Sequence, residues 1–285
     1  MHGEVKPTDA ALGAELRGLD LSKPLTSLEV ELIKQAWLDH SVLLFRGQDL
    51  DDDALIQFSK NFGKLELSPA SASATAGGQV HSQPEIWIIS NVVEDGQPIG
   101  ALGDKEADWH TDMSYVDEPP MGSILYSLEV PKVGGNTSFG NMYKAYEKLP
   151  AVLRDAAREL TCRHDSSTTS VGETRVGFEG VWDVRDAPGA VHPMVRVHPE
   201  TGGLALYLGR RRNAYVPGLE LEDSEDLLDE LWGHCTKPEF TWTHRWAKGD
   251  LVMWDNRCVI HRREAFSPRV RRVMHRTQIL GDKPR

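Results

Sequence analysis

Residues 86–93 read IWIISNVV, the first of several short apolar runs that decide the fold class. Four runs of the same kind follow: SILYSLEV (123–130), MVRVHP (194–199), LALYL (204–208) and DLVMWDN (250–256). Glycine-rich turn signals, among them VGG, ETGG and AKGD, lie between them. Many short strands joined by such turns are typical of a sandwich or an open barrel. The pattern therefore predicts a mainly β fold.

Helical patterns flank the β runs. Residues 28–40, LEVELIKQAWLDH, place apolar side chains on one face at helical spacing, and VLLFRG (42–47) is typical of a short buried strand. Asp51–Asp53 open a second helix, because acidic residues favour a helix N-terminus. A late helix is expected over SEDLLDELWGHC (224–235), capped by Asp223 and Ser224. We expect the first helix, strand and helix to form a layer packed on the outside of the β core.

Two segments carry no periodic pattern. Residues 68–79, SPASASATAGGQ, are small and polar, and residues 163–190 mix charge, glycine and threonine. Long loops of this kind are often lids over a functional site. No Pro/Gly/Ser linker separates two independent cores, and no internal repeat is visible. Residues 1–285 are therefore expected to form a single domain.

Composition argues against several classes of function. The formal net charge is −11 at pH 7, whereas broad nucleic-acid binding needs a basic surface. No stretch approaches the ~20 consecutive apolar residues of a membrane span, and the N-terminus lacks the pattern of a secretory signal. The three cysteines have no CxxC spacing, which favours reduced thiols over a disulfide framework. We therefore expect a cytoplasmic protein that binds neither nucleic acid nor membrane.

WHTDMSYVDEPP, residues 109–120, holds the first candidates for chemistry. His110 and Asp112 are two residues apart, so in a strand both side chains would point to one face and could converge on one ion. A strand end with solvated polar side chains would show the same pattern. His261, in WDNRCVIHRREAF (254–266), offers a third ligand. Two imidazoles and one carboxylate on a face leave three open positions, the facial arrangement of non-haem Fe(II) oxygenases, in which a 2-oxo acid and O2 can bind.

Two arginines follow His261 at a spacing that supports this interpretation. If residues 270–280 form a strand antiparallel to the His261 strand, Arg272 and Arg276 share one face of it. Guanidinium groups in an interior need anionic partners, which suggests carboxylates supplied from outside the chain. A solvated basic edge is the expectation for their neighbours, Arg262, Arg263, Arg269 and Arg271.

The motifs of this chain resemble those of the taurine dioxygenase/phenoxyacetate dioxygenase (TauD/TfdA) family of Fe(II)/2-oxoglutarate enzymes. The likeness, from near residue 10 to the C-terminus, rests on WHTDMSY (109–115), GGNTSFGNMYKAYEKLP (134–150), HPMVRVHPETG (192–202), WDNRCVIHR (254–262) and RRVMHRTQILGDKP (271–284). The resemblance implies a double-stranded β-helix (jelly roll) core with helices packed on one side. It also implies an oxidoreductase that uses Fe(II), 2-oxoglutarate and O2 and releases succinate and CO2, in a homo-oligomer (dimer or tetramer).

The same resemblance implies roles for individual side chains. The iron ligands would be His110, Asp112 and His261. Arg272 and Thr137 would bind the distal carboxylate of 2-oxoglutarate, a group suited to a bidentate guanidinium. Arg276 would bind the acidic group of the primary substrate. His81 stands where taurine-type members place a substrate-contacting histidine.

Two departures from the taurine enzymes bear on the substrate. KEAD (105–108) replaces an asparagine that helps to hold the sulfonate, and LYLGRRRNAYV (206–216) lacks an aromatic substrate contact. A small organic anion is expected, such as an aryloxyalkanoate, an N-acyl amino acid or an alkylsulfonate, with taurine itself as the alternative. Arg210–Arg212 could add a second anion contact, although exposure to solvent is the favoured interpretation.

Two functions of other classes stay open from the sequence. One is a zinc-dependent hydrolase that uses the same three ligands, and the other is a non-catalytic protein that binds a small acid on the same scaffold. The pairing of Arg272 with Thr137 counts against the hydrolase, because a hydrolase needs no 2-oxo acid. Asp112 favours hydroxylation over halogenation, since a halide would need the coordination site of the carboxylate. A hydroxylated carbon that bears a heteroatom would then lose it by bond cleavage.

Overall fold

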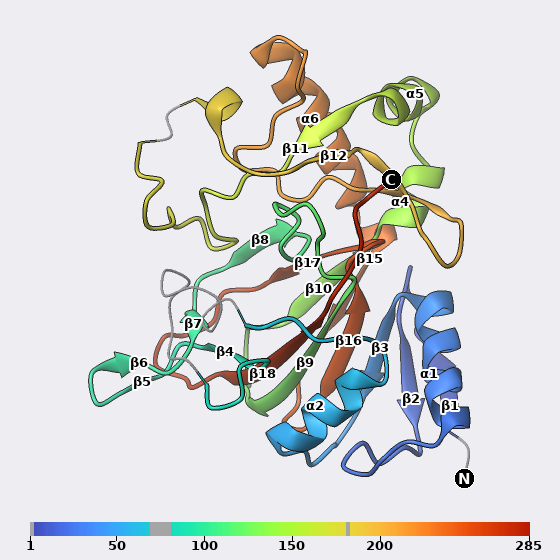
Figure 1. Ribbon diagram of the computed structural model, residues 1–285, viewed down its shortest axis with the longest axis vertical. Coiled ribbons are helices and arrows are strands. Elements are labelled where there is room, and N and C mark those ends of the chain that lie inside the picture. Colours follow the sequence, from blue (N-terminus) through green and yellow to red (C-terminus); the bar gives the residue numbers. More distant parts are fainter. Residues whose placement is uncertain (1–2, 69–80, 181–182) are drawn as a thin grey trace.

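Two β-sheets form the body of the protein, and the computed structural model describes residues 3–68, 81–180 and 183–285 (Figure 1). An eight-stranded sheet, here called the major sheet, has the order β1 (Glu4–Pro7), β2 (Ala14–Arg17), β3 (Val42–Phe45), β16 (Leu251–Asp255), β9 (Gly122–Glu129), β18 (Val273–Ile279), β4 (Trp87–Ser90) and β7 (Ala101–Leu102). A four-stranded sheet, the minor sheet, has the order β15 (Thr241–His244), β10 (Thr137–Asn141), β17 (Val259–Arg263) and β8 (Ala107–His110).

Helices and three small strand pairs complete the described part of the chain. The α-helices are α1 (Ser27–His40), α2 (Asp52–Lys60), α4 (Met142–Glu147), α5 (Ala151–Glu159) and α6 (Leu221–Cys235), and two short 3-10 helices span Val184–Asp186 and Pro238–Phe240. The strand pairs are β11 (Thr161–Arg163) with β12 (Val191–Pro193), β13 (Val195–Val197) with β14 (Leu204–Leu206), and β5 (Val93–Glu94) with β6 (Gln97–Pro98). The helices α5 and α6 lie at one end of the molecule, and α1 and α2 lie at the other (Figure 1). The expected mainly β fold with flanking helices is confirmed.

The major sheet has two buried faces. Alternate residues of a strand point to opposite faces, and in β9 Leu125 belongs to one apolar cluster while Ile124 and Tyr126 belong to another. The first cluster includes Phe139 of the minor sheet, so it fills the space between the two sheets. The second includes Trp37 of α1 and residues of α2, so these helices cover the outer face. We call these the inner and the outer face of the major sheet.

The N-terminal helices form where the sequence predicts them, but the strand between them differs from the expectation. The side chain of Thr26 caps α1, and Asp51 caps α2 by accepting a hydrogen bond from the backbone N–H of Ala54 (2.8 Å). The intervening strand β3 is an integral strand of the major sheet, paired antiparallel with β16 and parallel with β2. The helices therefore form the outer layer, and β3 belongs to the core.

The expected cap of the late helix is wrong. The helix α6 begins at Leu221, with Glu220 at the N-cap position, so Asp223 and Ser224 lie within its first turns. The buried hydroxyl of Ser224 accepts a hydrogen bond from the backbone N–H of Val216 (3.0 Å). Ser224 therefore fixes the turn that precedes the helix instead of the helix end.

The expected pairing of the His261 strand with residues 270–280 is also wrong. β18 pairs with β9 and β4 in the major sheet, whereas β17, which carries His261, pairs with β10 and β8 in the minor sheet. The two strands therefore face each other from different sheets. Their side chains can still converge, because both sheets contribute to the core between them.

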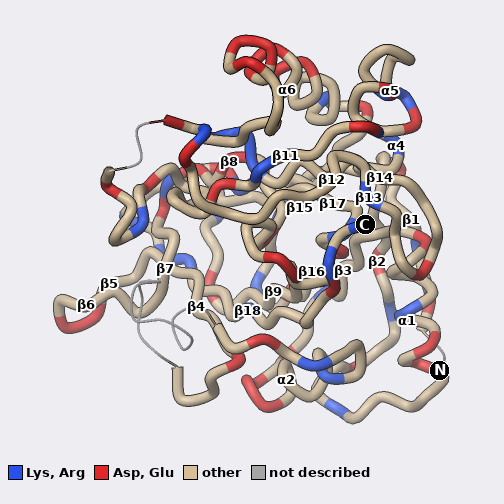
Figure 2. Tube along the Cα trace, turned by 45° about the horizontal axis from the view of Figure 1, so that its top comes forward, with Lys and Arg blue, Asp and Glu red and all other residues tan. Residues whose placement is uncertain are grey.

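The charged residues are distributed unevenly over the structure. Acidic side chains cluster along α6, and basic and acidic residues are interspersed elsewhere on the trace (Figure 2). Within the described residues, no helix combines the length and the apolar character of a membrane span.

Gly122, at the start of β9, provides a test of the packing between α1 and the major sheet. A Cβ atom at this position would lie 2.6 Å from the indole ring of Trp37, and Trp37 is buried among packed neighbours and cannot move freely. We expect Gly122→Ala to lower the free energy of unfolding by about 1–3 kcal/mol, measured by urea denaturation.

Gly233→Ala is the matched control. Gly233 lies inside α6, and no atom lies within 4 Å of an added Cβ. Alanine is the better helix former, so this variant should be unchanged or more stable by about 0.5–1 kcal/mol. Equal stability of the Gly122 variant and the native protein would contradict the packing described.

Candidate metal centre and adjoining cavity

Three side chains from two adjacent strands and one turn meet between the sheets. His110 is the last residue of β8, and its Cα atom is the register partner of His261 on β17. Asp112 lies just beyond β8, in a turn whose next residue, Met113, has a φ of 46°. The expectation that His110 and Asp112 share one face of a strand is therefore wrong in detail, since the turn rather than the strand aims the carboxylate.

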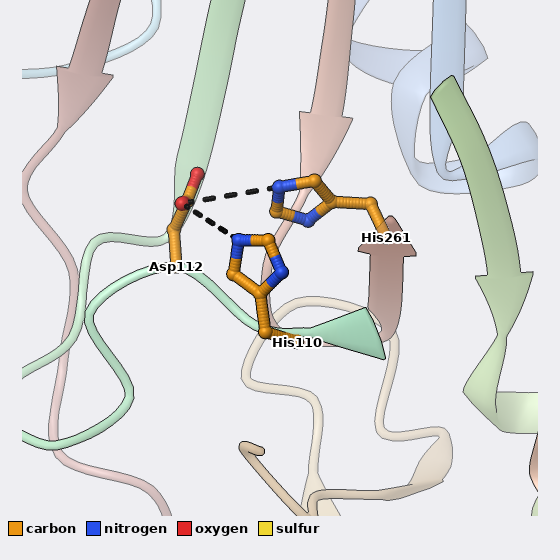
Figure 3. Close-up of side chains that lie close together, drawn as sticks. All are labelled: His110, Asp112 and His261. Carbon is orange, nitrogen blue, oxygen red and sulfur yellow. Dashed lines mark ion pairs between the residues drawn. The ribbon is translucent and has the colours of Figure 1, made fainter. Parts of the chain in front are cut away.

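The three side chains point toward one another (Figure 3). Oδ1 of Asp112 lies 3.8 Å from Nε2 of His110 and 3.9 Å from Nε2 of His261. All three residues are buried, and their candidate ligand atoms lie within 4.8 Å of one another. Two imidazole nitrogens and one carboxylate oxygen are a donor set for a divalent transition metal, with further coordination positions left open.

Both histidines present a nitrogen suited to a metal. Nδ1 of His110 lies 2.7 Å from the carbonyl oxygen of Asp108, and a carbonyl can only accept, so this nitrogen carries the hydrogen and leaves Nε2 free. Burial lowers the pKa of His110 well below its usual value, with the neighbouring His261 adding to the effect. Burial likewise lowers the pKa of His261 to about 4. Both rings are therefore neutral at pH 7, the form that binds metals.

Asp112 is held as a carboxylate by two donors of the major sheet. Arg276 Nη1 donates to its Oδ1 (2.9 Å), and the hydroxyl of Ser123 donates to its Oδ2 (2.7 Å). Burial opposes ionisation, but Arg276, the two histidines and the Ser123 bond outweigh it and hold the pKa of Asp112 well below its usual range. Asn256 and Gln278 donate to the Ser123 oxygen (3.0 and 3.2 Å), so the hydroxyl hydrogen is directed at Asp112.

The expected 2-oxo acid contacts lie in the same cavity as the two histidines. The charged and polar residues that line it are His110, Thr137, Ser170, His261, Arg263, Arg272 and Arg276. Arg272 is 1% exposed, and its Nε has no hydrogen-bond partner in the described part of the chain. Burial lowers the pKa of Arg272 to about 9, with nearby Arg263 adding to the effect. An anion in the cavity would relieve this unpaired guanidinium.

Thr137 is oriented by a residue that the sequence did not single out. The indole N–H of Trp246 donates to the Thr137 hydroxyl oxygen (3.0 Å). Because an indole N–H can only donate, the Thr137 oxygen accepts there and its own hydrogen stays available for an acceptor in the cavity. Thr137 and Arg272 therefore offer two donors to one anion.

Two arginines expected at the surface are buried. Arg263 lines the cavity and donates from Nη2 to the carbonyl oxygens of Leu102 and Lys105, so it holds the loop that precedes β8. Arg210 lies against His110, as its strand-bridge partner, and donates to the carbonyl oxygen of Thr168. The exposure expected for both residues is therefore wrong, and the hydrogen bonds to backbone carbonyls help each guanidinium to be buried.

The other members of these basic runs follow the expectation. Arg271 forms surface ion pairs with Glu94 and Glu129. Arg262 is partly exposed and pairs with Glu106 (3.5 Å). Arg212 is exposed, whereas Arg211 is partly buried by its ion pairs with Glu225 and Asp229 on α6.

His81 lies apart from the cavity. Its Nε2 is 3.2 Å from Asp52 at the start of α2, and its ring is 5.6 Å from that of His275. His275 alternates with Arg276 on β18, so it points to the outer face of the major sheet while Arg276 points to the inner face. The substrate contact assigned to His81 stays a prediction. Most of the loop expected at 68–79 lies outside the described residues.

The two histidines of the motif HPMVRVHPETG (192–202) have structural partners. Nε2 of His192 lies 2.9 and 3.0 Å from the carbonyl oxygens of Ser114 and Val116, so His192 braces the turn that carries Asp112. His198 pairs with Asp255 (3.0 Å), which Arg257 also binds.

The grouping of His198, Asp255 and Cys258 could in principle hold a metal. Arg257 contacts both carboxylate oxygens of Asp255, with donor distances of 2.8 and 2.7 Å. Burial raises the pKa of the Cys258 thiol far above its usual value, so it stays protonated. A metal would have to displace an arginine and deprotonate this thiol, and we assign these residues to packing.

A family model, several relatives and solved structures match this chain. The family model described as "Taurine catabolism dioxygenase TauD, TfdA family" matches residues 4–278. The chain is 31% identical to the (S)-phenoxypropionate/alpha-ketoglutarate-dioxygenase of Sphingobium herbicidovorans, over 98% of this chain and 95% of that protein. It is 35% identical to the alpha-ketoglutarate-dependent 2,4-dichlorophenoxyacetate dioxygenase of Cupriavidus pinatubonensis, over 97% of each. The solved structure of AAD-2 in complex with Mn(II) and N-oxalylglycine superposes with a TM-score of 0.81, at 29% identity, and covers 100% of this chain and 99% of that one.

Ser123 offers a test of the support beneath Asp112. Removal of its hydroxyl leaves one carboxylate oxygen without its donor, and loss of such a partner typically weakens metal binding by about 10- to 100-fold. We expect Ser123→Ala to raise the dissociation constant for Mn(II) by this amount in calorimetric titrations.

Ser127→Ala is the matched control for this substitution. Ser127 lies four residues along β9 on the same face, but its hydroxyl donates to the carbonyl oxygen of Ala247. Its loss should leave Mn(II) affinity unchanged. An unaltered dissociation constant in the Ser123 variant would show that this hydroxyl does not support the metal centre.

Proposed function

The chain belongs to the taurine catabolism dioxygenase TauD, TfdA family and is an alpha-ketoglutarate-dependent dioxygenase, and on this premise we propose that it holds Fe(II) through His110, Asp112 and His261. The family match spans residues 4–278. The relatives reported above are dioxygenases by name, which favours neither the zinc-dependent hydrolase nor the non-catalytic binding protein.

One observation supports the proposal most strongly. Arg272 is buried in the cavity that also contains the two histidines and Thr137, and within the described residues its Nε has no hydrogen-bond partner. A buried cation without a partner is costly, and the distal carboxylate of 2-oxoglutarate would pair with it. A structural zinc site would need four protein ligands instead of three ligands beside an open, basic cavity.

The metal and the site residues would have separate roles in the reaction. Bound Fe(II) would supply the coordination positions for 2-oxoglutarate and O2 and the oxidation that yields succinate, CO2 and a hydroxylated product. Arg272 and Thr137 bind the distal carboxylate and set the direction from which the 2-oxo acid enters. Arg276 binds the acidic group of the primary substrate and keeps Asp112 ionised. The apolar lining residues Ile89, Leu125 and Trp254 exclude water from the reacting C–H bond.

We propose a small organic anion as the primary substrate, such as an aryloxyalkanoate, an N-acyl amino acid or an alkylsulfonate. The two relatives described above act, by name, on phenoxypropionate and 2,4-dichlorophenoxyacetate. Within KEAD (105–108), only Ala107 lines the cavity, while Lys105 and Glu106 are exposed and pair with Glu173 and Arg262. A methyl group therefore takes the place of a polar contact here, which weighs against taurine itself.

Three further proposals concern the domain organisation, the cellular location and the oligomeric state. We propose that residues 1–285 form one domain with a double-stranded β-helix (jelly roll) core, because one apolar cluster joins the two sheets. A cytoplasmic location is supported by three cysteines, all buried and unbridged. The homo-oligomer (dimer or tetramer) rests on the family resemblance alone.

The function is tested by the release of succinate. Turnover should require Fe(II), 2-oxoglutarate and O2 together, and at least one acid from a panel of aryloxyalkanoates, alkylsulfonates and N-acyl amino acids should stimulate it above the background rate. Activity that needs zinc and no O2 would contradict the proposal.

A substitution of Arg272 tests its role, and the same substitution of Arg271 is the matched control. Because a charge-assisted bidentate pair would be lost, we expect Arg272→Gln to raise the KM for 2-oxoglutarate by about 10- to 100-fold. Arg271→Gln removes the same charge from a side chain that is 50% exposed and paired at the surface, so its KM should match that of the native enzyme. Equal KM values in the two variants would remove Arg272 from the co-substrate site.

A further inference from the structure

Glu66 lies beside Gln278 of β18, just beyond the residues of β18 that pair with β4. Leu65 and Ile279 form an antiparallel bridge, and the backbone N–H of Glu66 donates to the carbonyl oxygen of Gln278 (2.9 Å). Glu66 is therefore the direct cross-strand partner of Gln278. Directly opposed residues of an antiparallel pair point to the same face of the sheet.

That face is the inner one. Leu65 and Ile279 pack with the outer apolar cluster, so their neighbours Glu66 and Gln278 point the other way. Gln278 accepts a hydrogen bond from Nη2 of Arg276 (3.2 Å). The carboxyl group of Glu66 is therefore directed toward the side of the sheet on which Arg276 binds Asp112.

Glu66 has no partner there. Its Oε2 is buried and makes no hydrogen bond within the described residues. Burial raises the pKa of Glu66 to about 7, with Arg276 opposing the shift and Asp112 adding to it.

Arg276 is engaged elsewhere. It donates to Asp112 and Gln278, and its guanidinium lies over the ring of Trp87, 4.3 Å from the centroid. Among the described residues, no donor reaches the Oε2 of this half-buried carboxyl, so a donor on a bound substrate could pair with it.

We propose that Glu66 selects the primary substrate by accepting a hydrogen bond from an N–H group close to its acidic group. This inference rests on the proposed function, because it needs Arg276 to hold the acid. A substrate anchored there by its anion would have its next atoms on the inner face, the side to which Glu66 and Gln278 point. Once Glu66 is ionised, above its pKa of about 7, an N–H at that point satisfies the carboxylate, whereas an ether oxygen brings one acceptor against another. Among the candidate substrate classes, the geometry points to acids with an N–H near the anion, such as N-acyl amino acids.

N-phenylglycine and phenoxyacetate provide the test, because they differ only in an N–H in place of the ether oxygen. Their dissociation constants are measured by calorimetry well above pH 7, where Glu66 is ionised, and without O2, on protein loaded with Fe(II) and 2-oxoglutarate, so that no turnover occurs. The native protein should bind N-phenylglycine at least about tenfold more tightly, the discrimination expected when a site hydrogen-bonds one group and leaves its analogue unpaired.

Glu66→Gln should abolish this preference, because the glutamine amide can accept from the N–H or donate to the ether oxygen. Glu85→Gln is the control: Glu85 is a nearby half-buried carboxylate that pairs with Lys60 (3.6 Å) instead, and its loss should leave the preference intact. The proposal is overturned by an unchanged preference in the Glu66 variant, by a native preference for phenoxyacetate, or by no binding of N-phenylglycine.

Succinate release separates this inference from the proposed function. Native protein that prefers N-phenylglycine through Glu66 but forms no succinate with any acid would support the role of Glu66 and contradict the dioxygenase. Turnover that depends on 2-oxoglutarate, with identical preferences in the native and Glu66→Gln proteins, would support the dioxygenase and contradict the role of Glu66.

Discussion

The buried negative charge of Asp112 organises the space between the two sheets. A carboxylate in an interior is stable only with charged and hydrogen-bonding partners. The major sheet provides Arg276 and Ser123, and the minor sheet provides His261. The registers of β9, β18 and β17 must therefore all place these side chains at one point. Removal of one partner from a buried ion pair typically costs about 3–5 kcal/mol, which is why this cluster constrains the fold as well as the chemistry.

The same arrangement places the candidate metal ligands next to two buried arginines. Asp112 and the two histidines converge from one side, while Arg272 and Arg276 line the same cavity from β18 and the residue just before it. The carboxylate neutralises Arg276, whereas the Nε of Arg272 has no hydrogen-bond partner in the described part of the chain. We therefore expect Arg272 to bind an anion more strongly than Arg276 does. A 2-oxo acid would bind to Arg272, and a substrate acid would bind more weakly to Arg276.

Much of this site could be predicted from residue types and spacing. The pair His110 and Asp112, the later His261 and the arginines Arg272 and Arg276 are local patterns, and the structure brings all five together. The strand partners could not be predicted, because β18 inserts between β9 and β4, which lie far away in the sequence. The position of Asp112 in a turn also escaped prediction, since the two-residue spacing fits a strand equally well.

The supporting residues carry no signal that local reasoning can detect. Trp246 and Arg263 act through hydrogen bonds to residues remote in sequence, and Ser123 reaches Asp112 only through the turn that separates β8 from β9. The starts of α4 and α5, by contrast, do have a local signal in the sequence. Asn141 caps α4, and Pro150 directly precedes α5.

Anomalous diffraction at the iron edge, from crystals grown with Fe(II) and 2-oxoglutarate without O2, tests the central claim most directly. We predict one iron ion within about 2.0–2.2 Å of Nε2 of His110, Nε2 of His261 and one carboxylate oxygen of Asp112, distances normal for such ligands. The 2-oxo acid should chelate that ion and place its distal carboxylate on Arg272. Iron bound at any other residues, or 2-oxoglutarate bound away from Arg272, would contradict this assignment.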